Sequence, residues 1–178
     1  MAMEKKISVA EYFRYPETNR PMELVYGYVR EPPAPFGEHQ IAVFRIAKIL
    51  DAHVEPRRLG RILISPLDVV LDKESDLVVQ PDLLFVAHAR LGIVRDRVWG
   101  PPDLTIEVLS PGTIRHDRRS KLEWYRRYGV AECWIVNPAG ATLEVVDLKT
   151  HQRRSLEASA RIRSNVLPRL ATCVKRLL

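Results

Sequence analysis

Two segments, residues 82–86 and 103–109, are apolar on both of the faces that a β-strand presents. Strands of this kind lie in the centre of a sheet whose two faces are both covered. Each of the two also carries an acid, because Asp82 begins the first segment and Glu107 lies in the middle of the second. The sequence therefore predicts an α/β domain with carboxylates on its central, buried strands.

The rest of the chain supplies helices and further strands around these two. Its length of 178 residues favours a single domain over residues 1–178. The core order is helix, strand, strand, strand, helix, strand, with an N-terminal β-hairpin and C-terminal strands added, which is a mixed α/β sheet with helices on its faces. In the first half of the chain the expected elements are a helix over 8–15, a hairpin over 23–30, a helix over 39–54, a strand pair at 61–64 and 67–71 broken at Ser65-Pro66, and a turn at 72–76. They continue with a strand at 82–86, within the run 77–86 that Pro81 interrupts, a loop over 87–102 and a strand over 103–109. The rest of the chain is expected to form a helix over 114–128 closed by Gly129, strands at 131–136 and 143–148, a strand near 152–157 and a helix around 171–177.

The two strand carboxylates need partners. A buried, ionised carboxylate is costly unless it is paired, hydrogen-bonded or bound to a metal. Neighbouring strands lie ~4.8 Å apart, so two acids on one face of a sheet can share a single ion. Hard oxygen ligands of this type suit Mg²⁺. The alternative is that Glu107 pairs with an arginine and Asp82 caps a turn.

Lys121 is the third unusual residue. Arginine makes up 21 of the 28 basic residues, and Lys121 is the sole lysine between residues 74 and 148. At helical spacing it shares a face with Trp124, Tyr125 and Tyr128, so it points inward and needs a charged partner. That partner is either Asp117, one turn earlier, or the carboxylates of the preceding strand.

The positive charge of the chain is concentrated in its second half. Residues 1–90 carry 12 basic and 13 acidic side chains, whereas residues 91–178 carry 16 and 9. Clustered positive charge is typical of proteins that bind polyanions, although a solubilising surface has the same composition. Only 13 residues are aromatic, which disfavours a stacking platform for single strands.

Other classes of protein fit the sequence poorly. No run approaches the ~18 uncharged apolar residues of a membrane span, and the polar N-terminus is unlike a secretory signal. Cys133 and Cys173 lie far apart, so a disulfide framework is not expected and a cytoplasmic location fits. No membrane partner is expected.

These residues resemble the PD-(D/E)XK nuclease superfamily and, more closely, the Uma-type family of restriction endonucleases. The resemblance spans about residues 22–148, with a weaker match at 166–168. One position departs from the superfamily pattern, because Leu109 stands two residues after Glu107 where a lysine is usual. The matching residues are Glu23-Leu24-Val25-Tyr26-Gly27, His39, Pro81-Asp82-Leu83, the run from Pro102 to Pro111, Asp117, Lys121, Tyr125, Gly129-Val130 and Trp134.

The resemblance implies a restriction-endonuclease-like fold and a metal-dependent site. Asp82, Glu107 and the backbone carbonyl of Val108 would hold Mg²⁺ or Mn²⁺. Lys121 would take the place of the missing lysine and orient a water molecule. Glu23 and His39 would line the same cleft, and Glu23 would bind a second metal or the water. For these last two residues a capping or surface role remains the alternative.

The function implied is that of a metal-dependent endonuclease that hydrolyses phosphodiester bonds of DNA, with a duplex held through its backbone. A homodimer with two sites would suit the cutting of both strands. Two other functions stay open at this point. One is a nuclease-fold module that binds nucleic acid without cleaving it, and the other is a phosphohydrolase that uses the same carboxylates.

Overall fold

The computed structural model describes residues 6–16, 18–110 and 115–178, and the side chains of all of these except 115–118. A six-stranded mixed sheet forms its centre. Its strand order is β11-β10-β9-β8-β6-β3. β8 and β9 are parallel, and the other neighbouring pairs are antiparallel. The strands are β3 (Gly60–Ile64), β6 (Leu83–Ala87), β8 (Leu104–Val108), β9 (Glu132–Asn137), β10 (Thr142–Asp147) and β11 (Arg153–Leu156).

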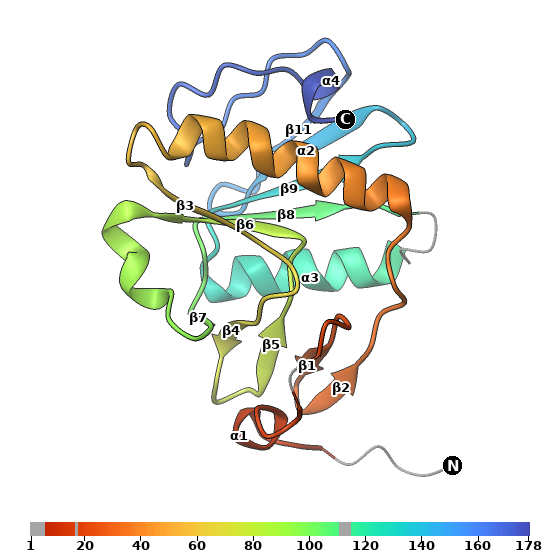
Figure 1. Ribbon diagram of the computed structural model, residues 1–178, viewed down its shortest axis with the longest axis vertical. Coiled ribbons are helices and arrows are strands. Elements are labelled where there is room, and N and C mark those ends of the chain that lie inside the picture. Colours follow the sequence, from red (N-terminus) through yellow and green to blue (C-terminus); the bar gives the residue numbers. More distant parts are fainter. Residues whose placement is uncertain (1–5, 17, 111–114) are drawn as a thin grey trace.

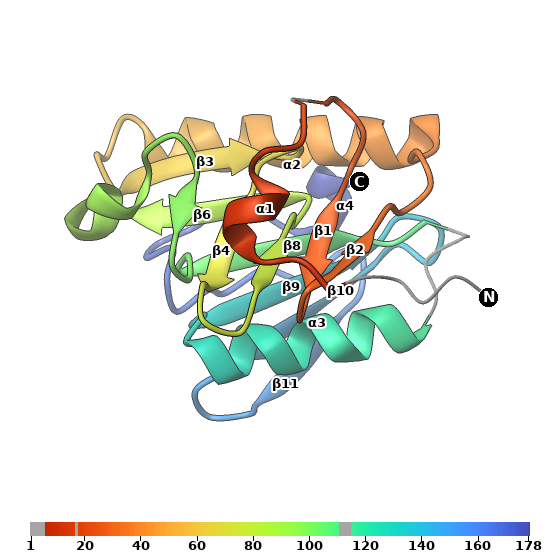
Figure 2. The same cartoon turned by 90° about the horizontal axis from the view of Figure 1, so that it is seen from below.

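Two helices cover the opposite faces of this sheet. Figure 2 shows α2 (Gly37–Val54) on one side and α3 (Arg115–Tyr128) on the other. The inward stripe of α2 includes Val43, Ile46 and Leu50, which are buried against the sheet as their spacing predicts. The order α2, β3, β6, β8, α3, β9 confirms the predicted core and the mixed α/β fold class.

A second, five-stranded sheet lies on the α3 side of the first (Figure 1). Aliphatic residues of this sheet pack in one cluster with α3 and with the central strands. The short helix α1 (Val9–Tyr12) packs against its outer surface. In spatial order its strands are β2 (Tyr28–Arg30), β1 (Glu23–Val25), β5 (Leu77–Val79), β4 (Val69–Asp72) and β7 (Val98–Trp99).

Local sequence signals account for several of these elements. Ser8 and Glu11 form the predicted capping box, although α1 ends earlier than the expected 8–15. The hairpin turns at Tyr26-Gly27, where φ is 51° and 88°, values that glycine adopts at no steric cost. Gly129 has φ of 95° directly after α3, as a helix C-terminus with a left-handed residue requires.

One sequence prediction about the strands is wrong. Segments 61–64 and 67–71 do not pair with each other, because β3 joins the central sheet and β4 joins the second sheet. The run 77–86 is interrupted at Pro81 as predicted, and its two parts, β5 and β6, also belong to different sheets. Both divisions occur at a proline, Pro66 and Pro81, which has no N–H to continue a ladder. A strand pattern shows which residues are extended but does not identify the partner strand.

The region expected as a loop over 87–102 also contains structure. It forms a 3₁₀ helix, η1 (His88–Ile93), and the two-residue strand β7, which pairs in parallel with β4. Elements this short have no periodicity that a sequence pattern could reveal.

The C-terminal segment returns to the α2 side of the central sheet. Ile162 and Leu167 enter the core there, and α4 (Val174–Leu177) packs beside α2. In the part of the chain that the structure describes, none of the helices has the length and apolar character needed to cross a bilayer.

Candidate active site

The two strand carboxylates lie on the same face of the central sheet. β6 and β8 are antiparallel neighbours with Leu83 opposite Ile106, so Asp82 lies next to Glu107 in the register. Leu83 and Ile106 point toward α2, whereas the alternate residues of both strands face α3. Asp82 and Glu107 therefore both face α3, which the register of the two strands decides and which sharing a single ion requires.

Glu107 is held at both of its oxygens. The Tyr125 hydroxyl donates a hydrogen bond of 2.5 Å to its Oε1, and Lys121 Nζ lies 3.3 Å from its Oε2. Both partners come from the inward face of α3, one turn apart. Tyr125 is completely buried, whereas the Glu107 side chain keeps 15% of its surface exposed.

Lys121 bridges two carboxylates that belong to different sheets. Its Nζ lies 3.0 Å from Glu23 Oε1, and Glu23 opens β1 in the second sheet. The same Glu23 oxygen accepts a hydrogen bond of 2.8 Å from the backbone N–H of Gln80. The ammonium is thus placed where the two sheets and α3 meet, and 12% of the Lys121 side chain stays exposed.

Asp82 is held in place by a side chain of α2 and by the backbone of β8. Its Oδ2 accepts a hydrogen bond of 2.7 Å from the Val108 backbone N–H and lies 3.1 Å from His39 Nε2. No residue that the structure describes is hydrogen-bonded to the other oxygen, Oδ1. One oxygen of a partly exposed carboxylate is therefore open to a ligand.

The charges of the cluster act strongly on one another. Burial, together with the negative charges of Asp82 and Glu23, raises the pKa of Glu107 to about 7, against the opposing effects of Lys121 and Tyr125. Burial lowers the pKa of Lys121, but the charges of Glu107 and Glu23 outweigh it, so the net shift is upward and the amine stays protonated.

The other two titratable groups of the cluster are also shifted. Burial raises the pKa of Tyr125 well above its usual range, and the charge of Glu107 adds to this, so the phenol remains a neutral donor. Burial lowers the pKa of His39, but its hydrogen bond to Asp82 and the nearby acids raise it to a greater extent. At neutral pH the cluster holds three carboxyl groups around one buried ammonium.

The structure thus brings together all five side chains that the sequence singled out: Glu23, His39, Asp82, Glu107 and Lys121. Val108 contributes its backbone N–H to this arrangement.

Two contributors were not predicted. The first is Tyr125, whose position one turn after Lys121 on the inward face was the available signal. The second is the Gln80 backbone N–H, which no sequence pattern could reveal. The side chain of Asp117 lies outside the described residues.

The donor set of the cluster fits a hard divalent cation. Asp82 and Glu107 supply carboxylate oxygens, the ligands that Mg²⁺ and Mn²⁺ prefer. Among the residues that the structure describes, no three His, Cys, Asp or Glu side chains gather closely enough to hold a metal by themselves. An ion at Asp82 and Glu107 would need a backbone oxygen and water to complete its coordination, which is the way Mg²⁺ is usually bound.

Comparisons with known proteins identify a family and a shared fold for this chain. A family model described as "Uma2: Putative restriction endonuclease" matches residues 9–174. The chain belongs to this family. Membership in the Uma2 family supports a nuclease function with nucleic acid as the substrate. The family model matches nearly the whole chain.

A solved structure extends the likeness to the fold. It is described as a putative nuclease belonging to DUF820 from Anabaena variabilis, and it superposes with a TM-score of 0.82. The alignment covers 96% of this Uma2 chain and 97% of the other at 21% identity, so it establishes the shared fold. The search of curated proteins found no match.

Proposed function

We propose that this Uma2 protein is a metal-dependent endonuclease that hydrolyses phosphodiester bonds of duplex DNA. The observation that carries the proposal is the Lys121 ammonium, which lies 3.0 Å from Glu23 and 3.3 Å from Glu107 beside a third carboxylate, Asp82. A structural ion pair would need one acid for one amine. Three acids lie near one amine, with His39 beside Asp82 as a second, titratable cation, so negative charge remains for a divalent cation to neutralise when Glu107 is ionised.

One Mg²⁺ or Mn²⁺ is the cofactor of this proposal. Asp82, through its open Oδ1, and Glu107 would hold it together with the backbone carbonyl of Val108. When bound, the ion would polarise a phosphate oxygen and lower the pKa of a coordinated water.

The chain's own residues would bind and orient the substrate around that position. The Lys121 ammonium would stabilise the charge that develops on the phosphate, since a buried cation acts strongly in a site that excludes water. Glu23 would hold the ammonium in place, as its 3.0 Å contact and its anchoring by the Gln80 N–H suggest. His39 would keep Asp82 in its orientation through the Nε2 contact.

Nicking of supercoiled plasmid tests the proposal. The purified protein should convert plasmid to the open-circular form with Mg²⁺ or Mn²⁺ and not with EDTA. Asp82→Asn and Lys121→Ala should each abolish the conversion. Glu144→Gln is the matched control, because Glu144 lies on β10 in an ion pair with Arg153 and is part of a different surface. Equal nicking by all variants would reveal a contaminant and refute the site.

The same experiment separates the remaining alternatives. A protein that retains duplex DNA on a gel without cutting it in either metal would be a nucleic-acid-binding module. Sedimentation of the protein tests the homodimer that two-strand cutting would suit, since a monomer should nick one strand at a time.

A further inference from the structure

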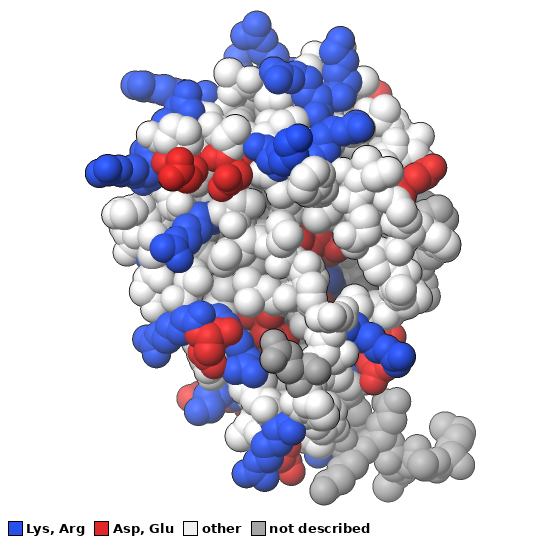
Figure 3. All heavy atoms as spheres, viewed as in Figure 1, with Lys and Arg blue, Asp and Glu red and all other residues white. Residues whose placement is uncertain are grey.

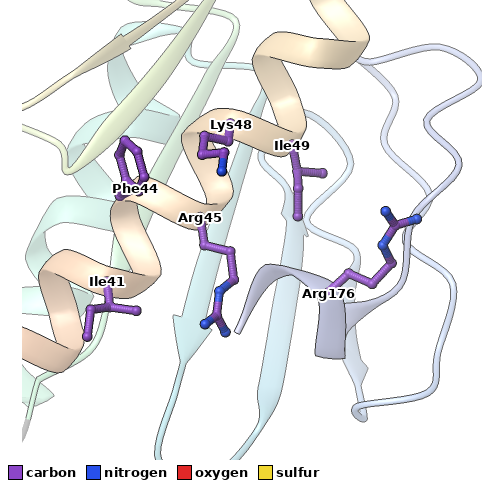
Figure 4. Close-up of a pocket in the computed structure, with 6 residues that line it drawn as sticks. All are labelled: Ile41, Phe44, Arg45, Lys48, Ile49 and Arg176. Carbon is purple, nitrogen blue, oxygen red and sulfur yellow. The ribbon is translucent and has the colours of Figure 1, made fainter.

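A groove lies on the outward face of α2, where α4 approaches it. One depression of about 420 Å³ is lined by Ile41, Phe44, Arg45, Lys48, Ile49 and Arg176 (Figure 4). A second, of about 350 Å³, shares three of these residues and continues toward Arg57 and Arg169. We call this continuous surface the α2–α4 groove. It lies on the other side of α2 from the core.

The groove gathers cations without acidic partners. Its walls include five basic side chains, and of the described residues that line it none is acidic. None of the five forms an ion pair with a described acidic residue. Figure 3 shows lysine and arginine side chains gathered over this upper part of the molecule. The five are Arg45, Lys48, Arg57, Arg169 and Arg176.

Repulsion among these five cations raises the free energy of the unliganded protein, and a bound anion would lower it. Like charges close together repel, and Asp51, the acid three residues after Lys48 on α2, forms no ion pair with any of the five. Four of the five cations are arginines, whose planar forks match phosphate oxygens in two-point contacts. A ligand with several phosphates would therefore satisfy the groove better than a single small anion.

The groove also presents apolar surface between the cations. Phe44 is 65% exposed and Ile41 is 58% exposed, which is unusual for large apolar side chains on a helix. The Lys48 ammonium lies 5.4 Å from the centre of the Phe44 ring. Nucleotides combine phosphates with flat sugar and base surfaces, so they fit this alternation of charge and apolar area.

The groove is connected to the candidate active site through α2. His39 points inward from this helix to Asp82, while Arg45 and Lys48 point outward. At 1.5 Å per residue these two lie about 9 and 14 Å further along the axis.

We propose that the α2–α4 groove binds the phosphate backbone of a nucleic acid, as a contact separate from the site at Asp82 and Glu107. The proposal rests on the proposed nuclease function for the choice of nucleic acid over other polyanions. Two of the five groove cations, Arg169 and Arg176, belong to the basic second half of the chain, and the other three come from α2 and the turn after it.

The test measures binding of a long labelled DNA duplex in EDTA, over a range of salt concentrations. The triple variant Arg45→Gln, Lys48→Gln, Arg176→Gln should bind more weakly at every salt concentration. The slope of log K against log salt should fall in magnitude by about 2.7, which is ~0.9 for each phosphate that the variant no longer neutralises. An unchanged slope would overturn the proposal.

A matched control removes the same charge elsewhere. The variant Arg14→Gln, Arg20→Gln, Lys149→Gln neutralises three exposed residues that do not line the groove. It should keep a slope close to that of the wild type. If it lowers the slope as much as the groove variant does, the protein binds DNA through its net charge and the groove has no special role.

A second copy of the chain is the competing occupant, and Phe44→Ser distinguishes it. Under our proposal this variant sediments as the wild type does and binds the duplex more weakly. A wild-type dimer that becomes a monomer in Phe44→Ser, with DNA binding unchanged, would make the groove a dimer interface and overturn the proposal.

The groove and the nuclease activity fail independently in these experiments. Binding in EDTA does not depend on cleavage, so loss of binding in the groove variant stands even if no plasmid is nicked. Conversely, metal-dependent nicking together with an unchanged salt slope would retain the nuclease and reject the groove.

Discussion

Two glutamates on adjacent strands, the partly buried Glu107 on β8 and the fully buried Glu132 on β9, illustrate how differently the two faces of the central sheet are used. Glu132 faces the α2 side and is fully buried. It accepts hydrogen bonds from Trp134 Nε1, Ser164 Oγ and the backbone N–H of Asn165, at 2.6 to 2.8 Å. These neutral donors attach the C-terminal segment to the sheet.

Glu107 faces the α3 side in a very different environment. It is surrounded by charged groups, since Lys121 contacts it and Asp82 and Glu23 act on it from nearby. Its own donors do not balance that negative charge, and part of the side chain reaches solvent. Burial of an acid in a strand therefore does not by itself indicate function. The charge that surrounds the acid separates a reactive group from a structural one.

Among the variants that test this contrast between Glu107 and Glu132, Glu107→Gln should have the largest effect on activity. We expect metal-dependent nicking to fall on the order of 10²–10³-fold, because the variant removes a charge that would bind the metal. Folding should not suffer. The folded-state pKa of about 7 lies above the ordinary value of 4.5, so the charged carboxyl destabilises the folded protein as pH rises between them.

Denaturant unfolding in EDTA checks the second part of this prediction. Glu107→Gln should be more stable than the wild type above pH 7, and the two should converge below pH 4.5. A variant that is less stable at high pH would show that Glu107 is a structural acid like Glu132.

Glu132→Leu should give the opposite result. Its three hydrogen-bond donors would be left buried without a partner, so the free energy of unfolding should fall by about 3 kcal/mol. Nicking per folded molecule should be retained at a temperature where the variant is folded. Chemical unfolding measures the loss, with Glu144→Gln on the adjacent strand as the control that should change little.

Tyr125→Phe should have a smaller effect, confined to activity. It removes the hydroxyl that holds Glu107 Oε1, so we expect about a tenfold loss of nicking or an equal rise in the metal concentration required. A titration with Mn²⁺ separates this from a packing defect. Tyr128→Phe, three residues further along α3 in the same core cluster, should leave the metal dependence unchanged.

Asp147→Asn should have the smallest effect on stability. Asp147 on β10 lies opposite Glu132 on β9, on the same face of the central sheet. Hydrogen bonds from the Thr150 and Lys149 backbone and from Asn165 lower the pKa of Asp147. A lowered pKa stabilises the fold above the unfolded-state value and loses that contribution as pH falls.

We therefore expect this variant to lose less than about 1 kcal/mol at neutral pH, because the group is largely exposed and solvent screens it. The difference should close at pH values below 3.8. Thermal unfolding across this range measures it, and a gap that persists in acid would mean that the carboxylate charge is not responsible.

Much of this contrast could be predicted from the sequence. Alternation along residues 82–86 and 103–109 predicted which side chains share a face with Asp82 or with Glu107 in each strand, and helical spacing pointed Lys121 inward. The register between the two strands, which the sequence did not show, put the two acids on one face. These are local, periodic properties that the backbone geometry of a strand or helix imposes. The partner of Lys121 stayed open between Asp117 and the strand acids, because helical spacing gives a direction and does not identify a neighbour.

The remaining features depend on the tertiary structure. Glu23 contacts Lys121 only because the second sheet packs on the α3 side of the central sheet. Tyr125 contacts Glu107 only because α3 crosses β8 next to Glu107. Pro66 and Pro81 marked the breaks within residues 61–71 and 77–86, but no local signal showed that the parts on either side join different sheets. The sequence determined which residues are buried and which way they point, since these follow from the period of each element. Only the packing of elements distant in the chain decided which charges face one another.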